Sequence, residues 1–252
     1  MSLLNLICER YDREARLYPA LLLIAPAAVT GVALFSAKLT GLQSLGAALV
    51  GFGGAFLLAQ LARDAGKSRE PSLYQLWGGM PSVLIFRHAH KRFDPITKAR
   101  YHKKLATLVK GANAPSPEDE EANPAAADEV YSAWSHYLRS HTRDTKKYPL
   151  LFQENVSYGY RRNVWGLRPI GIAVSLLCAL GAGGRLWFIH KGTGQIDQEL
   201  AGAVVVSLLF LALWLFRFTS EWVLVPANAY AERLAESLET IGGKGPVEKT
   251  KK

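Results

Sequence analysis

The sequence predicts an all-α polytopic membrane protein, with two transmembrane helical hairpins flanking a mostly helical cytoplasmic insert. Three observations support this fold class. Four apolar runs are each long enough to cross a hydrocarbon core of roughly 30 Å. They form two pairs, each joined by a short polar turn. Residues 63–168, between the pairs, contain 18 Lys and Arg and 11 Asp and Glu, and a segment with so many charges cannot enter a bilayer.

The N-terminal part of the chain is expected to begin on the membrane surface and then cross the bilayer twice. Residues 1–16 combine mixed charges with Leu3, Leu4, Ile7 and Tyr11 at helical spacing, which is typical of an interfacial amphipathic helix. The first hairpin covers residues 17–62. No charge lies between Arg16 and Lys38, and the second span runs from about residue 43 to 61. Together these runs form the first transmembrane hairpin.

Two helices are expected in the insert, residues 63–168. The first starts at Asp94 and Pro95, a pair that can cap and begin a helix, and ends at about Lys110. The second covers about residues 126–140, where apolar and aromatic side chains recur at helical spacing. The insert is therefore expected to fold around these two amphipathic helices.

Two other parts of the insert are expected to be non-helical. Residues 82–86 suit a short strand or a segment lying against the membrane, because Gly and Pro interrupt the apolar run around them. Residues 111–125 contain three prolines and four consecutive acidic residues. That composition is typical of a solvated loop without a fixed structure.

The second hairpin is predicted at residues 169–219. Its first span begins at Pro169, because proline suits the first turn of a helix, and its second covers about residues 200–216. Residues 220–252 follow as a cytoplasmic tail. We expect an amphipathic helix from Pro226 to about residue 240, and then a disordered Lys-rich end.

The distribution of basic residues predicts the orientation in the membrane. Nearly all Lys and Arg lie in the termini and the insert, whereas the two hairpin turns carry only Lys38, Arg185 and Lys191. Basic residues are retained on the cytoplasmic side of a membrane. The expected location is therefore the cell inner membrane, with both termini and the insert in the cytoplasm.

Two spans carry small residues at every fourth position. In lipid, such stripes allow helix backbones to approach closely, within one chain or between subunits. Chance in Gly- and Ala-rich helices is the alternative explanation. The first stripe consists of Ala47, Gly51, Ala55 and Ala59, and the second of Gly171, Ser175, Ala179 and Gly183.

A dense group of basic residues in the insert is a candidate site for an anionic ligand. Phosphates would meet the Lys and Arg side chains, and bases would stack on the tyrosine ring. Attraction to lipid headgroups explains the same charges equally well, so both interpretations stay open. The candidate residues are Arg87, Lys91, Arg92, Lys98, Arg100, Tyr101, Lys103 and Lys104.

Several classes of function find no support in the sequence. It has no phosphate-binding glycine loop, nucleophile elbow or zinc-protease motif, so we expect neither an enzyme nor a cofactor. His88, His90 and His102 match no closed zinc pattern and lie among basic residues, so no metal site is predicted. The spans hold almost no ionisable residues, which disfavours a transporter. A structural membrane protein or a channel remains.

A set of polar and small residues gives the chain a family resemblance. It resembles small bacterial four-span membrane proteins, some of which are effectors of antiphage systems such as Hailong. The set comprises Arg143-Asp144, Pro149-Leu150-Leu151, Glu154-Asn155, Tyr158-Gly159, Arg161-Arg162-Asn163 and Gly166-Leu167-Arg168-Pro169, with Thr97-Lys98 and Arg100-Tyr101-His102 upstream.

The resemblance implies an oligomeric channel in the inner membrane. It would be opened by a nucleotide or short oligonucleotide made by a partner nucleotidyltransferase, and would depolarise the infected cell. Four helices enclose no pore, so a channel requires a homo-oligomer, for instance a tetramer. The alternative is a non-conducting membrane scaffold whose insert docks a cytosolic partner.

Overall fold

The computed structural model describes residues 9–35 and 41–241, without the side chains of residues 41–53 and 55. Every regular element in these residues is a helix, which confirms the all-α prediction. The chain forms two compact units. The first unit consists of Met1–Pro71 and Val156–Val223, and the second of Ser72–Asn155 and Leu224–Lys252. Both therefore combine segments that are distant in the sequence.

Long helices build the first unit. The N-terminal helix starts at Arg10 and, after a π-helical turn, continues as the apolar helix α3. The interfacial helix was predicted at residues 1–16, and residues 1–8 lie outside the described residues. Near the C-terminal end of that range, Ala15 is fully buried. The elements are α2 Arg10–Asp12, η1 Arg13–Leu17, α3 Tyr18–Phe35, α4 Gly41–Trp77, α9 Pro149–Thr193, α10 Gln198–Ala212 and the π-helical η3 Leu213–Arg217.

Three helices in the described residues are long and apolar enough to cross a membrane. They are Arg10–Phe35, Pro149–Thr193 and Gln198–Arg217. The predicted span at residues 43–61 lies within α4, where most of its side chains are outside the description. Its place in the membrane, and the arrangement in two hairpins, therefore stay predictions.

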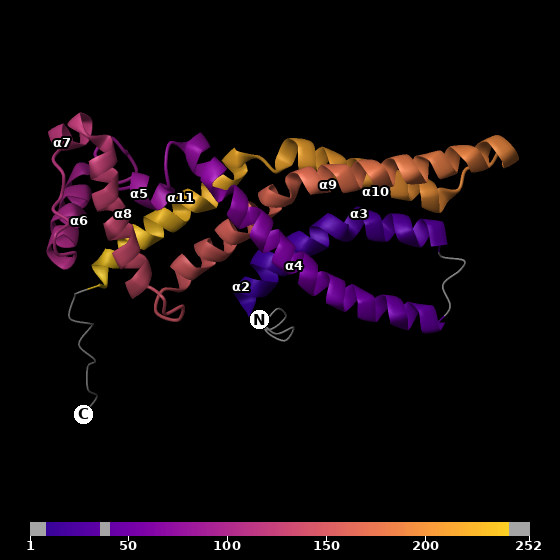
Figure 1. Ribbon diagram of the computed structural model, residues 1–252, viewed down its shortest axis with the longest axis horizontal. Coiled ribbons are helices and arrows are strands. Elements are labelled where there is room, and N and C mark those ends of the chain that lie inside the picture. Colours follow the sequence, from indigo (N-terminus) through magenta and orange to yellow (C-terminus); the bar gives the residue numbers. More distant parts are fainter. Residues whose placement is uncertain (1–8, 36–40, 242–252) are drawn as a thin grey trace, which may run out of the picture. The chain divides into compact units, whose positions relative to one another are not determined.

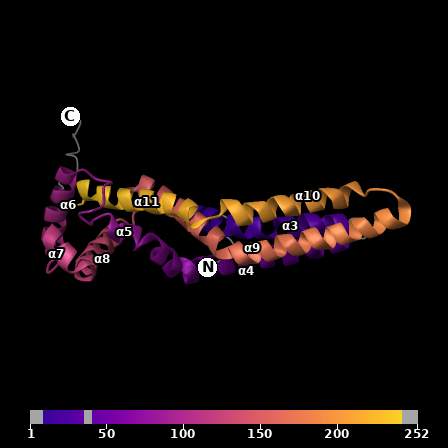
Figure 2. The same ribbon diagram turned by 90° about the horizontal axis from the view of Figure 1, so that it is seen from above.

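The apolar helices pack closely inside the first unit. Helices α9 and α10 run side by side in both views (Figures 1 and 2), and Val164, Leu167 and Trp214 are buried among them. At Gly171 the backbone of α9 meets the Trp214 indole, and a Cβ added there would overlap that ring. The close approach of α9 to the Trp214 ring of η3 therefore depends on a residue without a side chain.

Several stripe residues are buried within this one chain. Ser175, Ala179 and Ala59 are at most 8% exposed, and at Gly183 a Cβ would only reach ordinary contact with Val204, at 3.8 Å. The side chains of Ala47, Gly51 and Ala55 lie outside the described residues. Part of the second stripe thus serves packing between helices of one chain, and contacts between subunits stay a prediction.

Shorter helices surround the core of the second unit. Its largest fully buried side chains include Phe86, Leu105, Tyr131 and Trp134. The C-terminal helix contributes Leu234 and Leu238 to this same core. The elements are α5 Pro81–Leu84, α6 Pro95–Leu108, α7 Pro117–Ala122, α8 Pro124–His141, the part of α11 Ser220–Glu236 that follows Val223, and the 3₁₀ turn η4 Ser237–Glu239.

The two segments predicted to be non-helical each contain a helix. Residues 82–86 overlap α5, where Pro81 occupies the first turn and Val83 enters the core. Residues 111–125 contain α7, which starts with a capping box between Ser116 and Asp119. Each of these two side chains accepts a hydrogen bond from the backbone N–H of the other, which stabilises even a short helix. The loop predicted at residues 111–125 was wrong because this capping was overlooked. A strand at residues 82–86 was wrong because Pro81 suits the first turn of a helix, whereas a position against the membrane stays a prediction.

Helices α9 and α11 start earlier than expected. Pro169 was predicted to begin a helix, but it lies inside α9, which starts twenty residues earlier at Pro149. Pro226 likewise lies inside α11, which starts at Ser220. A proline within a helix removes one backbone hydrogen bond, and packing around long helices tolerates this loss. The two predicted helices of the insert are confirmed as α6 and α8.

Candidate functional site

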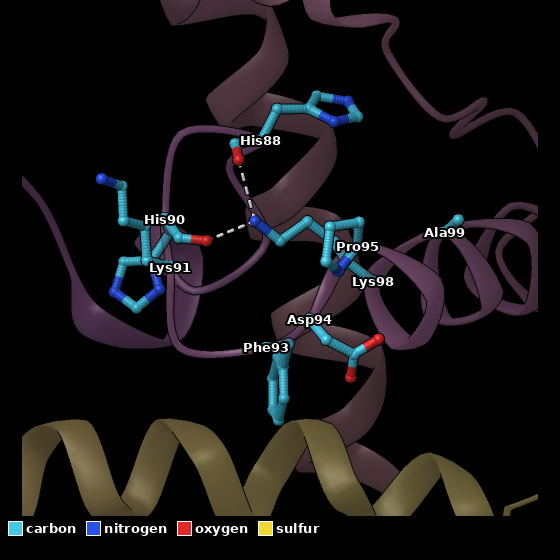
Figure 3. Close-up of a pocket in the computed structure, with 8 residues that line it drawn as sticks. All are labelled: His88, His90, Lys91, Phe93, Asp94, Pro95, Lys98 and Ala99. Carbon is cyan, nitrogen blue, oxygen red and sulfur yellow. Dashed lines mark hydrogen bonds between the residues drawn. The ribbon is translucent and has the colours of Figure 1, made fainter.

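Lys98 is the central residue of the predicted basic site, and its charged group is used inside the protein. Asp94 accepts a 2.9 Å hydrogen bond from the Thr97 N–H and so caps α6, which carries Lys98. The Lys98 ammonium donates to the carbonyl oxygens of Arg87 and His88, both at 2.9 Å, and also to that of His90. Figure 3 shows the bonds to His88 and His90. The residue is only 7% exposed. Lys98 therefore holds the preceding loop in place.

The three arginines of the predicted site have acidic partners. Arg87 forms two hydrogen bonds with Asp128, at 2.8 and 2.5 Å, and this raises its pKa. Arg92 contacts Glu232 at 2.7 and 2.9 Å, and the hydrogen bond with this carboxylate raises the Arg92 pKa. Arg100 contacts Glu239 at 2.5 Å. Much of the positive charge is thus neutralised within the second unit.

Two further members of the predicted site also face inward. Lys104 donates to the backbone carbonyl of Leu238. Tyr101 is only 4% exposed, and its ring packs edge-on against Phe93 with centroids 5.4 Å apart. A nucleic-acid base therefore has no open tyrosine face on which to stack. Within the described residues, only Lys91 and Lys103 of the predicted set are exposed and lack an ion pair.

A pocket of about 370 Å³ adjoins this loop (Figure 3). His88, His90, Phe93 and Asp94 line it, but their side chains point in different directions rather than toward one centre. Lys91 is its exposed cation. The pocket can thus offer an anion one flexible ammonium group, whereas Lys98 is occupied by carbonyl oxygens.

A buried polar network next to this loop was not foreseen. The Glu120 carboxylate accepts the His88 backbone N–H at 2.9 and 3.1 Å and the Tyr131 hydroxyl at 2.6 Å. His102 donates from Nε2 to the Phe86 carbonyl at 2.8 Å, and burial lowers its pKa to about 4. These groups join α6, α7 and α8 in one hydrogen-bonded core. The capping box at Ser116 was the sequence signal that could have indicated it.

The described residues contain no group of three His, Cys, Asp or Glu side chains that could hold a metal ion. The imidazole rings of His88 and His102 do meet edge-on, with centroids 4.9 Å apart. However, one nitrogen of each ring hydrogen-bonds to a backbone carbonyl oxygen. His88 Nε2 lies 3.0 Å from the Pro115 oxygen, and His102 Nε2 contacts the Phe86 oxygen. The His88 side chain therefore connects two loops, and His102 connects α6 to the loop that follows α5.

The first unit contains a second candidate site, which we call the polar junction: Tyr158, Arg162 and Asn163 of α9, Glu70 of α4 and the Ala15 carbonyl. Arg162 Nη1 donates to Glu70 at 3.1 Å, and the Tyr158 hydroxyl donates to the same oxygen at 2.6 Å. The Arg162 side chain is 7% exposed. A buried ion pair is costly unless hydrogen bonds complete it, and this network supplies them.

Asn163 extends the polar junction to the N-terminal helix. Its Oδ1 accepts from Nε and Nη2 of Arg162 at 3.2 and 3.1 Å. Its Nδ2 donates to the carbonyl of Ala15 at 2.6 Å, within the π-helical turn η1. A π-helical turn alters the regular hydrogen bonding of a helix and is frequent at functional sites. A side chain of α9 thus contacts the irregular turn.

A similar arrangement occurs at the other π-helical turn, η3. Arg168 of α9 donates from Nε to the Trp214 carbonyl and from Nη2 to the Leu215 carbonyl, both at 2.9 Å. These carbonyls lie in the last turn of the helix, where cations are favourable. Helix α9 therefore binds, through polar side chains, both π-helical turns found in the described residues of the first unit.

Two glycines bring α4 and α9 together at the polar junction. A Cβ at Gly166 would lie 2.5 Å from the backbone nitrogen of Gly66 and 2.6 Å from the Ala65 carbonyl oxygen. A Cβ at Gly66 would overlap the Asn163 side chain. Only backbones without side chains can approach this closely. The glycines thus set the distance across which Arg162 and Glu70 meet.

Comparison of this chain with protein-family models, curated proteins and solved structures finds no match. The polar junction therefore rests on its own geometry. Its α9 residues lie in the segment on which the family resemblance was based, but sequence reasoning gave none of them a role. Their contacts with Glu70 and Ala15 span 92 and 148 positions, so no local pattern indicates them.

Proposed function

We propose that this protein is a homo-oligomeric effector of the inner membrane, in which rearrangement of the polar junction opens an ion-conducting path. The observation that supports this proposal is a partly buried ion pair, joined to a buried amide, in the same unit as long apolar helices. Ionisable groups buried beside membrane-spanning segments are costly and commonly serve function. The apolar helices suit a pore that closes by dewetting.

The second unit would receive the opening signal on the cytoplasmic side. Helices α4, α9 and α11 each contribute residues to both units, so helical backbone joins the units at these three places. An anionic signal, such as a nucleotide or short oligonucleotide from a partner nucleotidyltransferase, would first meet Lys91 and Lys103. Stronger binding would require Arg92 or Arg100 to leave its acidic partner.

Planar-bilayer recordings of the purified full chain test the conducting path. Arg162→Met combined with Glu70→Met removes the charged pair together, a change that is often tolerated by folding. We expect this double variant to change the open probability relative to the wild type. The exposed Arg139, changed to Met, serves as the control and should conduct normally. A wild-type protein that stays silent with nucleotides and oligonucleotides at all voltages would remove the channel proposal.

A second candidate function is a non-conducting membrane scaffold that docks a cytosolic protein. The internal pairing of Arg87, Arg92 and Arg100 favours it, because a surface already neutralised is a weak polyanion site. Silent recordings, together with a stoichiometric protein partner captured by the full chain, would support the scaffold. Loss of that partner in the Lys91→Glu and Lys103→Glu variants would locate the docking surface.

A further inference from the structure

The first unit contains a pocket of about 320 Å³ that is separate from the polar junction. Aromatic side chains form much of its wall, and one guanidinium group lies in it. The residues that line it include Glu14, Tyr18, Ser157, Tyr160, Arg161 and Trp222. The pocket therefore combines apolar ring surface with a fixed positive charge.

This pocket lies at the polar ends of two apolar helices. Tyr18 is the first residue of α3, which has no charged residue as far as Phe35. Trp222 follows closely after Arg217, where the apolar helix α10 and its π-helical turn end. Tyrosine and tryptophan are enriched where a membrane-spanning helix meets the headgroups. In a bilayer, this pocket would lie at headgroup depth.

Two arginines lie against the Trp222 indole. Arg161 Nη1 donates to the Trp222 carbonyl at 2.8 Å, and its guanidinium lies 5.0 Å from the ring centroid. The Arg217 guanidinium lies 5.2 Å from the same centroid, and the described residues show no ion pair for it. Glu14 is the acidic residue of the pocket, and its carboxylate lies 2.9 Å from Nε of Arg10. Local charge therefore favours an anion.

We propose that this pocket binds the phosphodiester of a glycerophospholipid headgroup. Arg161 contacts the phosphate, because a guanidinium matches the geometry of phosphate oxygens. Arg217 adds positive charge, while Tyr18 and Tyr160 border the glycerol and the first methylene groups. The inference rests on the membrane insertion in the proposed function, but it is independent of ion conduction.

Native mass spectrometry of the full chain in detergent micelles tests this site. The probes are phosphatidylglycerol and a diacylglycerol with the same acyl chains but no phosphate. Ser157→Glu places a negative charge in the pocket, whereas Ser157→Gln has nearly the same size without charge. We expect phosphatidylglycerol to bind the wild type and Ser157→Gln, and to bind Ser157→Glu about tenfold more weakly, since like charges repel at short range.

Additional measurements distinguish the ways in which the proposal could be wrong. Equal affinity for phosphatidylglycerol and diacylglycerol, or equal affinity of the two Ser157 variants, would overturn the headgroup site. Displacement of the lipid by millimolar inorganic phosphate would indicate a site for free phosphate, which also contradicts the proposal. Alkaline carbonate extraction of wild-type membranes checks insertion separately. Release of the chain by carbonate would remove the membrane function itself, whereas retention without lipid binding would remove only this site.

Discussion

Asn163 donates a 2.6 Å hydrogen bond from its side-chain amide to the backbone carbonyl of Ala15. Both residues are buried, at 1% and 0% exposure, and the acceptor lies in the π-helical turn η1. The same amide group accepts two hydrogen bonds from Arg162. One side chain therefore connects an irregular backbone turn to a buried charge.

Replacing Asn163 with Leu should destabilise the first unit. The change leaves the Ala15 carbonyl and two Arg162 nitrogens without these partners, and an unsatisfied buried polar group costs about 1–3 kcal/mol. Thermal unfolding of the full chain in detergent would measure the loss. Gln153→Leu, at an exposed position of the same helix, is the control and should unfold near the wild-type temperature. Equal melting of all three proteins would contradict this role.

Replacing Gly166 with Ala should separate α4 from α9. The new Cβ would lie 2.5–2.6 Å from backbone atoms of Gly66 and Ala65, which cannot move as a flexible side chain can. Overpacking of this kind typically costs about 1–3 kcal/mol. Gly181→Ala in the same helix meets nothing within 4 Å and should be neutral. Thermal unfolding of both variants makes the comparison, and similar losses at the two glycines would refute the close approach.

Replacing Lys98 with Met should loosen the loop next to α6. Three carbonyl oxygens would lose their donor while the apolar stem of the side chain is preserved. We expect a loss of about 1.5–3 kcal/mol, since hydrogen bonds from charged donors are stronger than those from neutral donors. Lys103→Met, at an exposed position of the same helix, should have little effect. Hydrogen exchange of the amides around His90 would report the loosening, and unchanged protection would argue against it.

Stability should decrease as the pH is lowered through the range in which free histidine becomes protonated. Burial lowers the His102 pKa from 6.5 to about 4 in the folded state. Between these values the unfolded chain binds a proton that the folded chain does not. The free energy of unfolding therefore falls from pH 6.5 toward pH 4, by about 2 kcal/mol after allowance for solvent screening. Melting curves across this range measure it.

A substitution identifies the source of this pH dependence. His102→Gln keeps a side-chain donor for the Phe86 carbonyl but cannot titrate, so its melting should change less between pH 6.5 and 4. His136 lies exposed on α8, and His136→Gln should retain the wild-type profile. A profile that is identical in all three proteins would exclude His102 as the origin.

Local patterns predicted much of the fold. Asp94 and Pro95 indicated the start of α6, and uncharged apolar runs indicated the long apolar helices. The partners of the basic residues could not be predicted in this way. Arg92 and Arg100 meet Glu232 and Glu239, which are 140 and 139 positions away. Only the packing of the C-terminal helix brings these charges together, and the apparent excess of positive charge on α6 therefore overstated what a ligand could reach.

The ammonium group of Lys98 also has a consequence for chemical labelling. An amine reagent needs a free lone pair and room to approach, and this nitrogen is enclosed by three carbonyl oxygens. Lys91 and Lys103 are open to solvent, so they should be acetylated early. Modification of Lys98 would require the loop to open first. The acetylation rate of Lys98 would therefore measure how often this loop unfolds locally in the native protein.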